Sequence, residues 1–353
     1  MSSASAIHWS RLPHEIKLAV LDNLPLSDVW ACSRIDKISY SVCLPILFRT
    51  VRLPTLEALL DFLKAVPSYR YTLIRDLFVC SKSQYIDLYD YDAFTRPSSP
   101  EATASIATLL IDCTSLDSLS LSVCGSLASE TILPVFRELG MVKKFRLENL
   151  EQEDIRPFSE RLAVSLAFSL PALEELSLTR ITRSARHAHE LHCSGVPIAQ
   201  GDDDIPAHSL LGDELRLPQL FRLPNLKRLR IRDTHLGDPL WAGFEGDGTQ
   251  TVACCPLEVI DLGSCAYISP FANEAHTARI LARVPSSITS CALSTSLPFP
   301  SGDAFTPTLT KTKDDETNST LDQSSSPSCP QLPSLPHLPR FVACSHALLR
   351  ILP

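Results

Sequence analysis

The chain lacks a surplus of positive charge, because 32 lysines and arginines stand against 40 aspartates and glutamates, a formal net charge of −8. A phosphate backbone is held mainly by clustered lysine and arginine side chains, so this balance argues against nucleic acid as a partner. No apolar run approaches the roughly 20 residues of a membrane-spanning helix. Residues 1–10 also lack the basic and apolar regions of a signal peptide. We therefore expect no membrane partner and a location in the cytoplasm or the nucleus.

Motifs of catalysis are missing as well. The chain has no phosphate-binding glycine loop, no G-x-S-x-G and no H-E-x-x-H. The nearest glycine-rich stretch, GFEGDG at 243–248, follows no strand pattern and leads into no helix pattern, so it is interpreted as a turn or loop. We expect a protein that is not an enzyme and that needs no cofactor.

Cysteine spacing argues against disulfides and metal centres. The 12 cysteines contain no C-x-x-C pair and no secretory signal precedes them, which favours reduced and mostly buried thiols. His187, His189, His192 and Cys193 could supply zinc ligands. Their spacing, H-x-H-x-x-H-C, matches no common structural zinc finger, and no second ligand pair lies nearby. A solvated loop is the better interpretation, and no metal site is predicted.

Leucine-rich motifs recur from about residue 70 onward. The pattern L-x-x-L-x-L occurs eight times, and a spacing of 31 residues between first positions occurs three times. Leucine-rich repeats are about 20–29 residues long, so these units resemble long repeats with a helix in each return. The eight candidate motifs are Ile74/Leu77/Val79, Leu116/Leu119/Leu121, Val142/Phe145/Leu147, Leu173/Leu176/Leu178, Leu226/Leu229/Ile231, Leu257/Ile260/Leu262, Ile288/Cys291/Leu293 and Leu338/Phe341/Ala343.

Many of the 27 prolines mark the boundaries of these units. Pro171, Pro224 and Pro256 stand just before a motif, where proline would end a helix before the next strand begins. Side chains alternate along a strand, so the leucines should point into a shared core while the residues between them line an exposed face. We interpret that face as the surface that binds a partner, with the candidate residues Lys143, Lys144, Arg146, Glu175, Lys227, Arg228 and Arg230.

The first fifty residues predict three short helices. Pro13 and Glu15 favour a helix start, and the helix over 12–24 carries an apolar stripe of Ile16, Ala19, Val20 and Leu24 that we expect to be buried, with Lys17 on the outside. Ser27 and Asp28 predict the cap of a second helix, and a third spans 37–48. Three short helices cannot bury all their apolar faces against one another, so a partner should cover the remainder.

Two polar segments interrupt the repeats. Residues 182–222 are interpreted as a long, partly disordered loop, and residues 298–333 as a disordered segment rich in serine, threonine, proline and aspartate. Residues 334–353 then form a terminal repeat or a cap.

The run LPHEIKLAVLDNLPLSDVWACSRIDKISYSVCLPILFRTVRL, residues 12–53, resembles the F-box in its fungal form. Leu12-Pro13 and Glu15-Ile16 match the family's opening Leu-Pro-x-Glu-Ile, and Leu24-Pro25 matches a later Leu-Pro. The third helix departs from the family, which has Val-Cys and Trp where this chain has Ile35-Asp36 and Tyr40. The resemblance implies docking on a Skp-type adaptor, through the candidate residues Leu12, Pro13, Ile16, Val20, Leu24, Pro25, Leu26, Val29 and Trp30.

The implied architecture is α+β, with a three-helix F-box at 8–53 and an irregular leucine-rich-repeat solenoid at 54–297. The resemblance implies a non-catalytic substrate-recognition subunit of an SCF-type cullin-RING ubiquitin ligase. The adaptor would link the chain to a cullin scaffold, and the repeats would hold a protein substrate close to the ubiquitin-transferring subunits. The alternative is a repeat protein that binds a partner through the same sheet without any link to ubiquitin.

Overall fold

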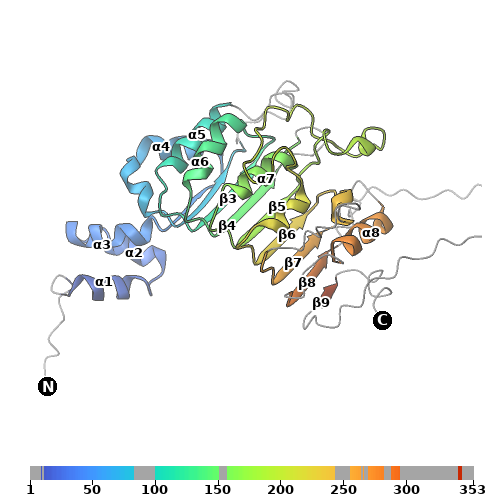
Figure 1. Ribbon diagram of the computed structural model, residues 1–353. Helices are drawn as coiled ribbons and strands as arrows, with labels where there is room; N and C mark the ends of the chain where they lie inside the picture. Colours follow the sequence, from blue (N-terminus) through green and yellow to red (C-terminus); the bar gives the residue numbers. More distant parts are fainter. Residues whose placement is uncertain are drawn as a thin grey trace, which may run out of the picture.

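The computed structural model describes residues 9, 12–82, 100–150, 157–242, 255–263, 265, 269–281, 288–294 and 341–343. Three short helices stand at one end of a parallel sheet whose strands alternate with helices (Figure 1). The N-terminal helices are α1 (His14–Leu21), α2 (Leu26–Cys32) and α3 (Lys37–Leu47). The chain therefore combines helices and strands in the expected order, with the helical part first.

The sheet has nine strands in the described residues, arranged in chain order, and every neighbouring pair is parallel. The strands are β1 (Thr50–Leu53), β2 (Asp76–Cys80), β3 (Ser118–Val123), β4 (Lys144–Asn149), β5 (Glu175–Thr179), β6 (Arg228–Arg232), β7 (Val259–Gly263), β8 (Ser290–Ser294) and β9 (Phe341–Ala343). Each of the eight leucine motifs contributes one of the strands β2 to β9, and these strands form one open parallel sheet. β1 was not among the predicted strands, and it pairs with β2, so the sheet begins inside the F-box-like run.

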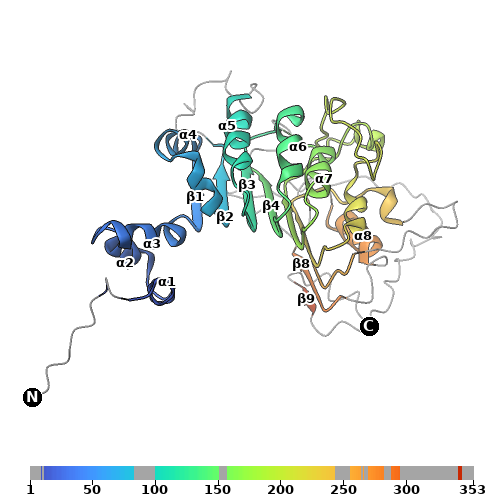
Figure 2. The same ribbon diagram turned by 60° about the vertical axis from the view of Figure 1, so that its left-hand side comes forward.

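The returns between strands run along one face of the sheet. Helices α4 to α7 lie side by side there, and the 3-10 helix η5 packs beside α7 (Figures 1 and 2). The return elements are α4 (Leu56–Ala65), η2 (Ser68–Leu73), α5 (Pro100–Ile111), α6 (Ser129–Glu138), α7 (Glu160–Phe168), η4 (His189–Leu191), η5 (Leu217–Arg222), η6 (Pro239–Ala242) and α8 (Pro270–Leu281). No described helix or strand covers the opposite face of β3 to β7, which is called the open face below.

The core lies between the sheet and these helices. Parallel register places Leu119, Phe145 and Leu176 side by side on neighbouring strands, and two residues further on it aligns Leu121 with Leu147. These side chains are at most 2% exposed, because a strand turns alternate residues toward the helices. Burying each large apolar side chain contributes about 1.5–3 kcal/mol, so the repeated leucine positions hold the sheet to its helical cover.

Local signals set the helix boundaries. The hydroxyl of Thr55 accepts a hydrogen bond of 3.1 Å from the amide of Ala58 and caps α4, and Ser159 accepts one of 3.1 Å from the amide of Arg161 and caps α7. Pro171 follows α7 before β5 begins, as predicted for a residue that cannot continue a helix.

The segment 182–222 differs from its prediction. The structure describes all of it, it contains η4 and η5, and it buries Leu191, Leu211 and Leu215. It is an ordered connection from β5 to β6 rather than a partly disordered loop. The predicted disordered segment 298–333 lies outside the described residues, and of the predicted terminal repeat or cap only β9 is described.

Among the helices that the structure describes, none is both long enough and apolar enough to cross a membrane.

Candidate functional site

The three N-terminal helices enclose a small core of their own. Leu21, Val29, Val42 and Cys43 are at most 1% exposed, and partly buried residues such as Leu24 pack around them. The indole of Trp9 donates a hydrogen bond of 2.8 Å to the hydroxyl of Ser39, which ties the segment before α1 to α3. The core is small, as expected for about forty residues.

Helix α1 is rotated relative to its prediction. Lys17 is buried, and its amino group lies 5.9 Å from the centroid of the Trp9 ring, whereas Ile16 and Val20 are 49% and 41% exposed. A lysine can occupy the inner side because its aliphatic stem packs against apolar neighbours while its charge rests on an aromatic face. The predicted buried stripe of Ile16, Ala19 and Val20 therefore faces outward, which is a correction to the sequence interpretation.

Large exposed apolar side chains are concentrated on these helices. Residues 12–48 hold seven of the eleven in the described part of the chain. Ile16 and Val20 are one turn apart on α1, and Leu26 and Trp30 one turn apart on α2, so each pair shares a helix face. The seven residues, called the apolar helix surface below, are Ile16, Val20, Leu26, Trp30, Ile35, Ile38 and Tyr40.

Five of the predicted adaptor residues are not among the seven large exposed apolar side chains. Pro13 and Pro25 are exposed, while Leu12 and Leu24 are only half-buried. Val29 is completely buried in the core of the three helices, so it cannot contact a partner and its candidate role is corrected.

Ile35, Ile38 and Tyr40 are exposed members that the candidate set left out. The inward positions Ser39, Val42 and Cys43 recur at helical spacing, and this periodicity could have placed Ile38 and Tyr40 outside.

The two departures from the family pattern in the third helix have structural uses. Asp36 caps α3 by accepting a hydrogen bond of 2.7 Å from the amide of Ser39, and this backbone hydrogen bond lowers the pKa of the Asp36 carboxyl. The ring of Tyr40 contacts the guanidinium group of Arg70, whose central carbon lies 5.7 Å from the ring centroids of Tyr40, Phe48 and Tyr69. Arg70 lies in η2, so this contact joins the N-terminal helices to the sheet.

A second candidate surface is the open face. Register aligns Ser118, Lys144, Glu175 and Arg228 in one row across β3 to β6. The next row aligns Ser120, Arg146, Ser177, Arg230 and Asp261 across β3 to β7. Five of the seven predicted substrate residues line a hollow of about 410 Å³ on this face: Lys144, Arg146, Glu175, Arg228 and Arg230.

The other two predicted substrate residues, Lys143 and Lys227, lie just before β4 and β6, outside the residues that line the hollow. The amino group of Lys227 donates a hydrogen bond of 2.8 Å to Glu174, and this bond lowers the pKa of Glu174 and raises that of Lys227. The candidate set did not include Glu148, Arg232 or Asp261, although Asp261 lies between two residues of its leucine motif and was therefore expected on the exposed face. The polar alternation continues to Glu148 and Arg232 beyond the leucine motif, and following it to the strand ends would have found both.

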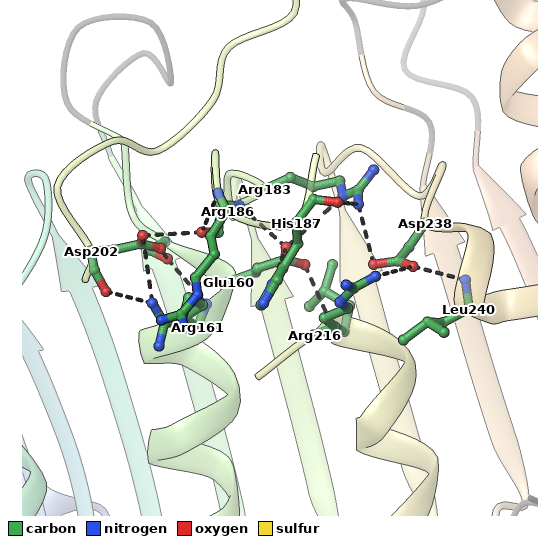
Figure 3. Close-up of polar contacts among 12 residues, drawn as sticks. Glu160, Arg161, Arg183, Arg186, His187, Asp202, Arg216, Asp238 and Leu240 are labelled. Carbon is green, nitrogen blue, oxygen red and sulfur yellow. Dashed lines mark hydrogen bonds and ion pairs between the residues drawn. The ribbon is translucent and has the colours of Figure 1, made fainter. Parts of the chain in front are cut away.

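A buried polar cluster lies beyond the carboxyl ends of β5 and β6 (Figure 3). Glu160 accepts hydrogen bonds from the backbone amides of Ser184 at 3.2 Å and Leu217 at 3.4 Å. One carboxylate in the first turn of α7 thus holds both ends of the long β5–β6 connection, at a helix end that favours negative charge. The cluster comprises Glu160, Arg161, Arg183, His187, Asp202, Arg216 and Asp238.

Further hydrogen bonds and ion pairs attach the β5–β6 connection to α7 and to the segment after β6. Asp202 accepts hydrogen bonds from the hydroxyls of Ser159 and Ser184, while Arg161 donates one of 2.9 Å to the Asp202 carbonyl. Arg183 donates to Asp238 at 3.2 Å, and burial raises the pKa of the Asp238 carboxyl. Nearly every charged group in the cluster is engaged with another part of the chain, so we assign it a structural role.

The predicted loop histidines do not converge on one point in the structure. His187 Nδ1 lies 3.6 Å from the carboxylate of Glu160, whereas the rings of His189 and His192 stack 6.0 Å apart and Cys193 is exposed. The described residues contain no group of three or more histidine, cysteine or carboxylate side chains placed to hold a metal ion.

Seven of the nine cysteines in the described residues are buried. Burial raises the pKa of Cys113 to about 12 and that of Cys291 to about 11, so these thiols stay protonated at neutral pH. The burial of most of these thiols agrees with the prediction for that part of the chain.

Comparison of the chain with protein-family models and with curated protein sequences gives no match. The geometry of the apolar helix surface and of the open face is therefore what supports a function.

Proposed function

We propose that the chain is the substrate-recognition subunit of an SCF-type cullin-RING ubiquitin ligase. Its N-terminal helices act as an F-box that binds a Skp-type adaptor, and its sheet acts as a leucine-rich-repeat-like solenoid that binds a protein substrate. The observation that carries the proposal is the apolar helix surface, with Leu26 60% and Trp30 57% exposed.

Exposed apolar side chains at this density favour a protein partner. Contiguous apolar patches on protein surfaces mark interaction sites, and buried tryptophans dominate binding energies. Covering a large apolar side chain contributes about 1.5–3 kcal/mol when it passes from fully exposed to buried, so the half-exposed members would each contribute part of that. Trp30 has the largest apolar side chain of the seven and is the expected centre of the interface.

The sheet supports the second half of the proposal. One strand per unit, parallel pairing in chain order and helices on one face are features of a leucine-rich-repeat solenoid. The N-terminal helices stand at the β1 end of that sheet (Figure 2). An adaptor on the helices and a substrate on the open face would occupy different parts of the chain. Its contribution to ubiquitin transfer would then be proximity.

The test is retention of a purified fungal Skp-type adaptor by the immobilised full chain. We expect the wild type to retain the adaptor, and Leu26→Ser with Trp30→Ala to reduce retention at least tenfold. Ile111→Ser is the matched control, because Ile111 is equally exposed at 59% but lies on α5. Failure of the wild type to retain adaptor would overturn the proposal and leave a protein-binding scaffold unconnected with ubiquitin.

A further inference from the structure

The open face carries more positive than negative groups, although the whole chain has a net charge of −8. On the outward positions of β4 to β7 there are five cations and three carboxylates, which leaves a surplus of two positive charges. The cations are Lys144, Arg146, Arg228, Arg230 and Arg232, and the carboxylates are Glu148, Glu175 and Asp261.

One of the two surplus positive charges arises beside Glu175, where two cations share one carboxylate. Its Oε1 atom lies 3.5 Å from Nζ of Lys144 and 3.2 Å from Nη1 of Arg228, so one carboxylate serves two cations. The side chains of Lys144 and Arg228 are each 58% exposed. A further carboxylate from solution could reach both cations without displacing Glu175.

The other surplus positive charge arises beside Asp261, which also serves two cations. Its Oδ2 atom lies 2.7 Å from Nε of Arg230 and 2.8 Å from Nη2 of Arg232, while the side chain of Asp261 itself is only 8% exposed. Arg230 and Arg232 are 50% and 43% exposed. Guanidinium groups bind carboxylates through paired N–H donors, so both retain donors for a second acceptor.

Between these two groups lies the hollow of about 410 Å³. Its floor includes Ser120 and Ser177, whose side chains are short beside the neighbouring lysine and arginines. In the part of the chain that the structure describes, neither serine hydroxyl forms a hydrogen bond. The hydroxyl groups of Ser120 and Ser177 can therefore form hydrogen bonds with a segment that crosses the hollow.

We infer that the open face binds an acidic segment of a partner protein, one carboxylate pairing with Lys144 and Arg228 and another with Arg230 and Arg232. This deepens the proposed function by naming the chemistry of the substrate, and it rests on that function.

The two groups set the spacing of the acids. Glu175 and Asp261 are on strands β5 and β7, two strand spacings or about 10 Å apart, with an offset of two residues or about 7 Å along the strands. The carboxylates should thus be about 12 Å apart, which corresponds to side chains about four residues apart in an extended peptide.

A peptide fits this face better than nucleic acid. Glu148, Glu175 and Asp261 stand among the cations, and they would repel the evenly spaced phosphates of a nucleic acid backbone. Two carboxylates at the predicted spacing instead match a surplus of two charges.

The test is fluorescence anisotropy of a labelled glycine-serine peptide that carries two glutamates four residues apart, titrated with the full chain at low salt. Peptides with adjacent glutamates or with two glutamines should bind at least threefold more weakly. Arg228→Gln should weaken binding at least threefold. Glu175→Gln should tighten it at least twofold, because the competing carboxylate is removed, and a misfolded variant cannot show such a gain.

Lys64→Gln is the matched control, since Lys64 is 76% exposed on α4 and should leave binding unchanged. Equal binding of the glutamine peptide, or no gain in Glu175→Gln, would overturn the inference. Tighter binding of a single-stranded oligonucleotide than of the peptide would also overturn it. Adaptor retention is measured on the same preparation to separate the two proposals. Adaptor binding without peptide binding rejects only this inference. Peptide binding without adaptor binding rejects only the proposed function.

Discussion

The guanidinium group of Arg183 donates a hydrogen bond of 3.2 Å to the carboxylate of Asp238, and the two side chains are 0% and 1% exposed. Arg183 follows β5 and Asp238 follows β6, so this buried pair joins the start of the β5–β6 connection to the segment after β6. Arg183 also contacts Glu190 at 2.7 Å and lies 3.9 Å from Glu160. It is therefore the cation beside two buried carboxylates, Glu160 and Asp238, and the half-exposed Glu190.

Replacing Arg183 by methionine should destabilise the fold strongly. The substitution removes the arginine beside Glu160 and leaves Asp238 with the more distant Arg216, whose Nη1 atom lies 3.7 Å from Oδ1 of Asp238. Removing one partner of a buried ion pair costs about 3–5 kcal/mol. Urea unfolding at neutral pH measures this loss. Arg186→Met is the control, because Arg186 pairs with Asp213 in solvent and its loss should change the unfolding free energy by less than about 1 kcal/mol. Equal effects of the two variants would contradict a structural role for the buried polar cluster.

Acid should destabilise the fold through His235. Burial, and then the charge of Arg183, lower the pKa of His235 from 6.5 to about 4. The unfolded chain therefore binds this proton first, so the stability present above about pH 6.5 is lost as the pH falls toward 4. Between pH 7.5 and 5 the expected loss from this group is about 2 kcal/mol.

His235→Asn should reduce that pH dependence, measured by urea unfolding at both pH values. Asparagine keeps an acceptor for the Gly237 amide, which donates to Nδ1 of His235 at 3.2 Å. Some pH dependence should remain, because burial also lowers the pKa of His276. An unchanged slope in the variant would show that His235 does not titrate in this way.

Gly237 should tolerate no side chain. A Cβ atom there would overlap the ring of His235 and lie 2.7 Å from Cε1 of His276. Gly237→Ala must therefore shift the buried ring of His235 and the partly buried ring of His276, and we expect a loss of about 1–3 kcal/mol in unfolding free energy. Gly140→Ala is the matched control, since no atom lies within 4 Å of its added Cβ. Thermal unfolding of both variants measures the difference, and equal melting temperatures would contradict the packing.

The sheet could be predicted from the sequence because its signal is local. Leu176 and Leu178 lie two residues apart on β5 and their burial follows from strand alternation. The same logic placed Arg228 and Arg230 on the exposed face, where the structure has them.

The rest could not be predicted because its causes are not local. Arg161 contacts the Asp202 carbonyl 41 residues away, and Arg183 contacts Asp238 at a separation of 55 residues, so neither pair produces a periodic pattern. A polar composition then indicated disorder for a segment whose charges are satisfied inside the fold. The prediction of which face of α1 is buried was wrong for a related reason. Lys17 can be buried because its amino group lies over the ring of Trp9, and this contact is not visible in the periodicity of the helix.

Arg70 should hold the N-terminal helices against the sheet. Its guanidinium carbon lies 5.7 Å from the ring centroids of Tyr40 and Phe48 on the α3 side and of Tyr69 within η2. Each such contact contributes about 0.5–1 kcal/mol at an exposed site. Arg70→Leu should thus loosen α3 and speed amide hydrogen exchange there several-fold, because local opening becomes easier. Arg34→Leu, at an exposed arginine just after α2, is the control. Unchanged exchange in α3 of Arg70→Leu would mean that the helices are held to the sheet by other contacts.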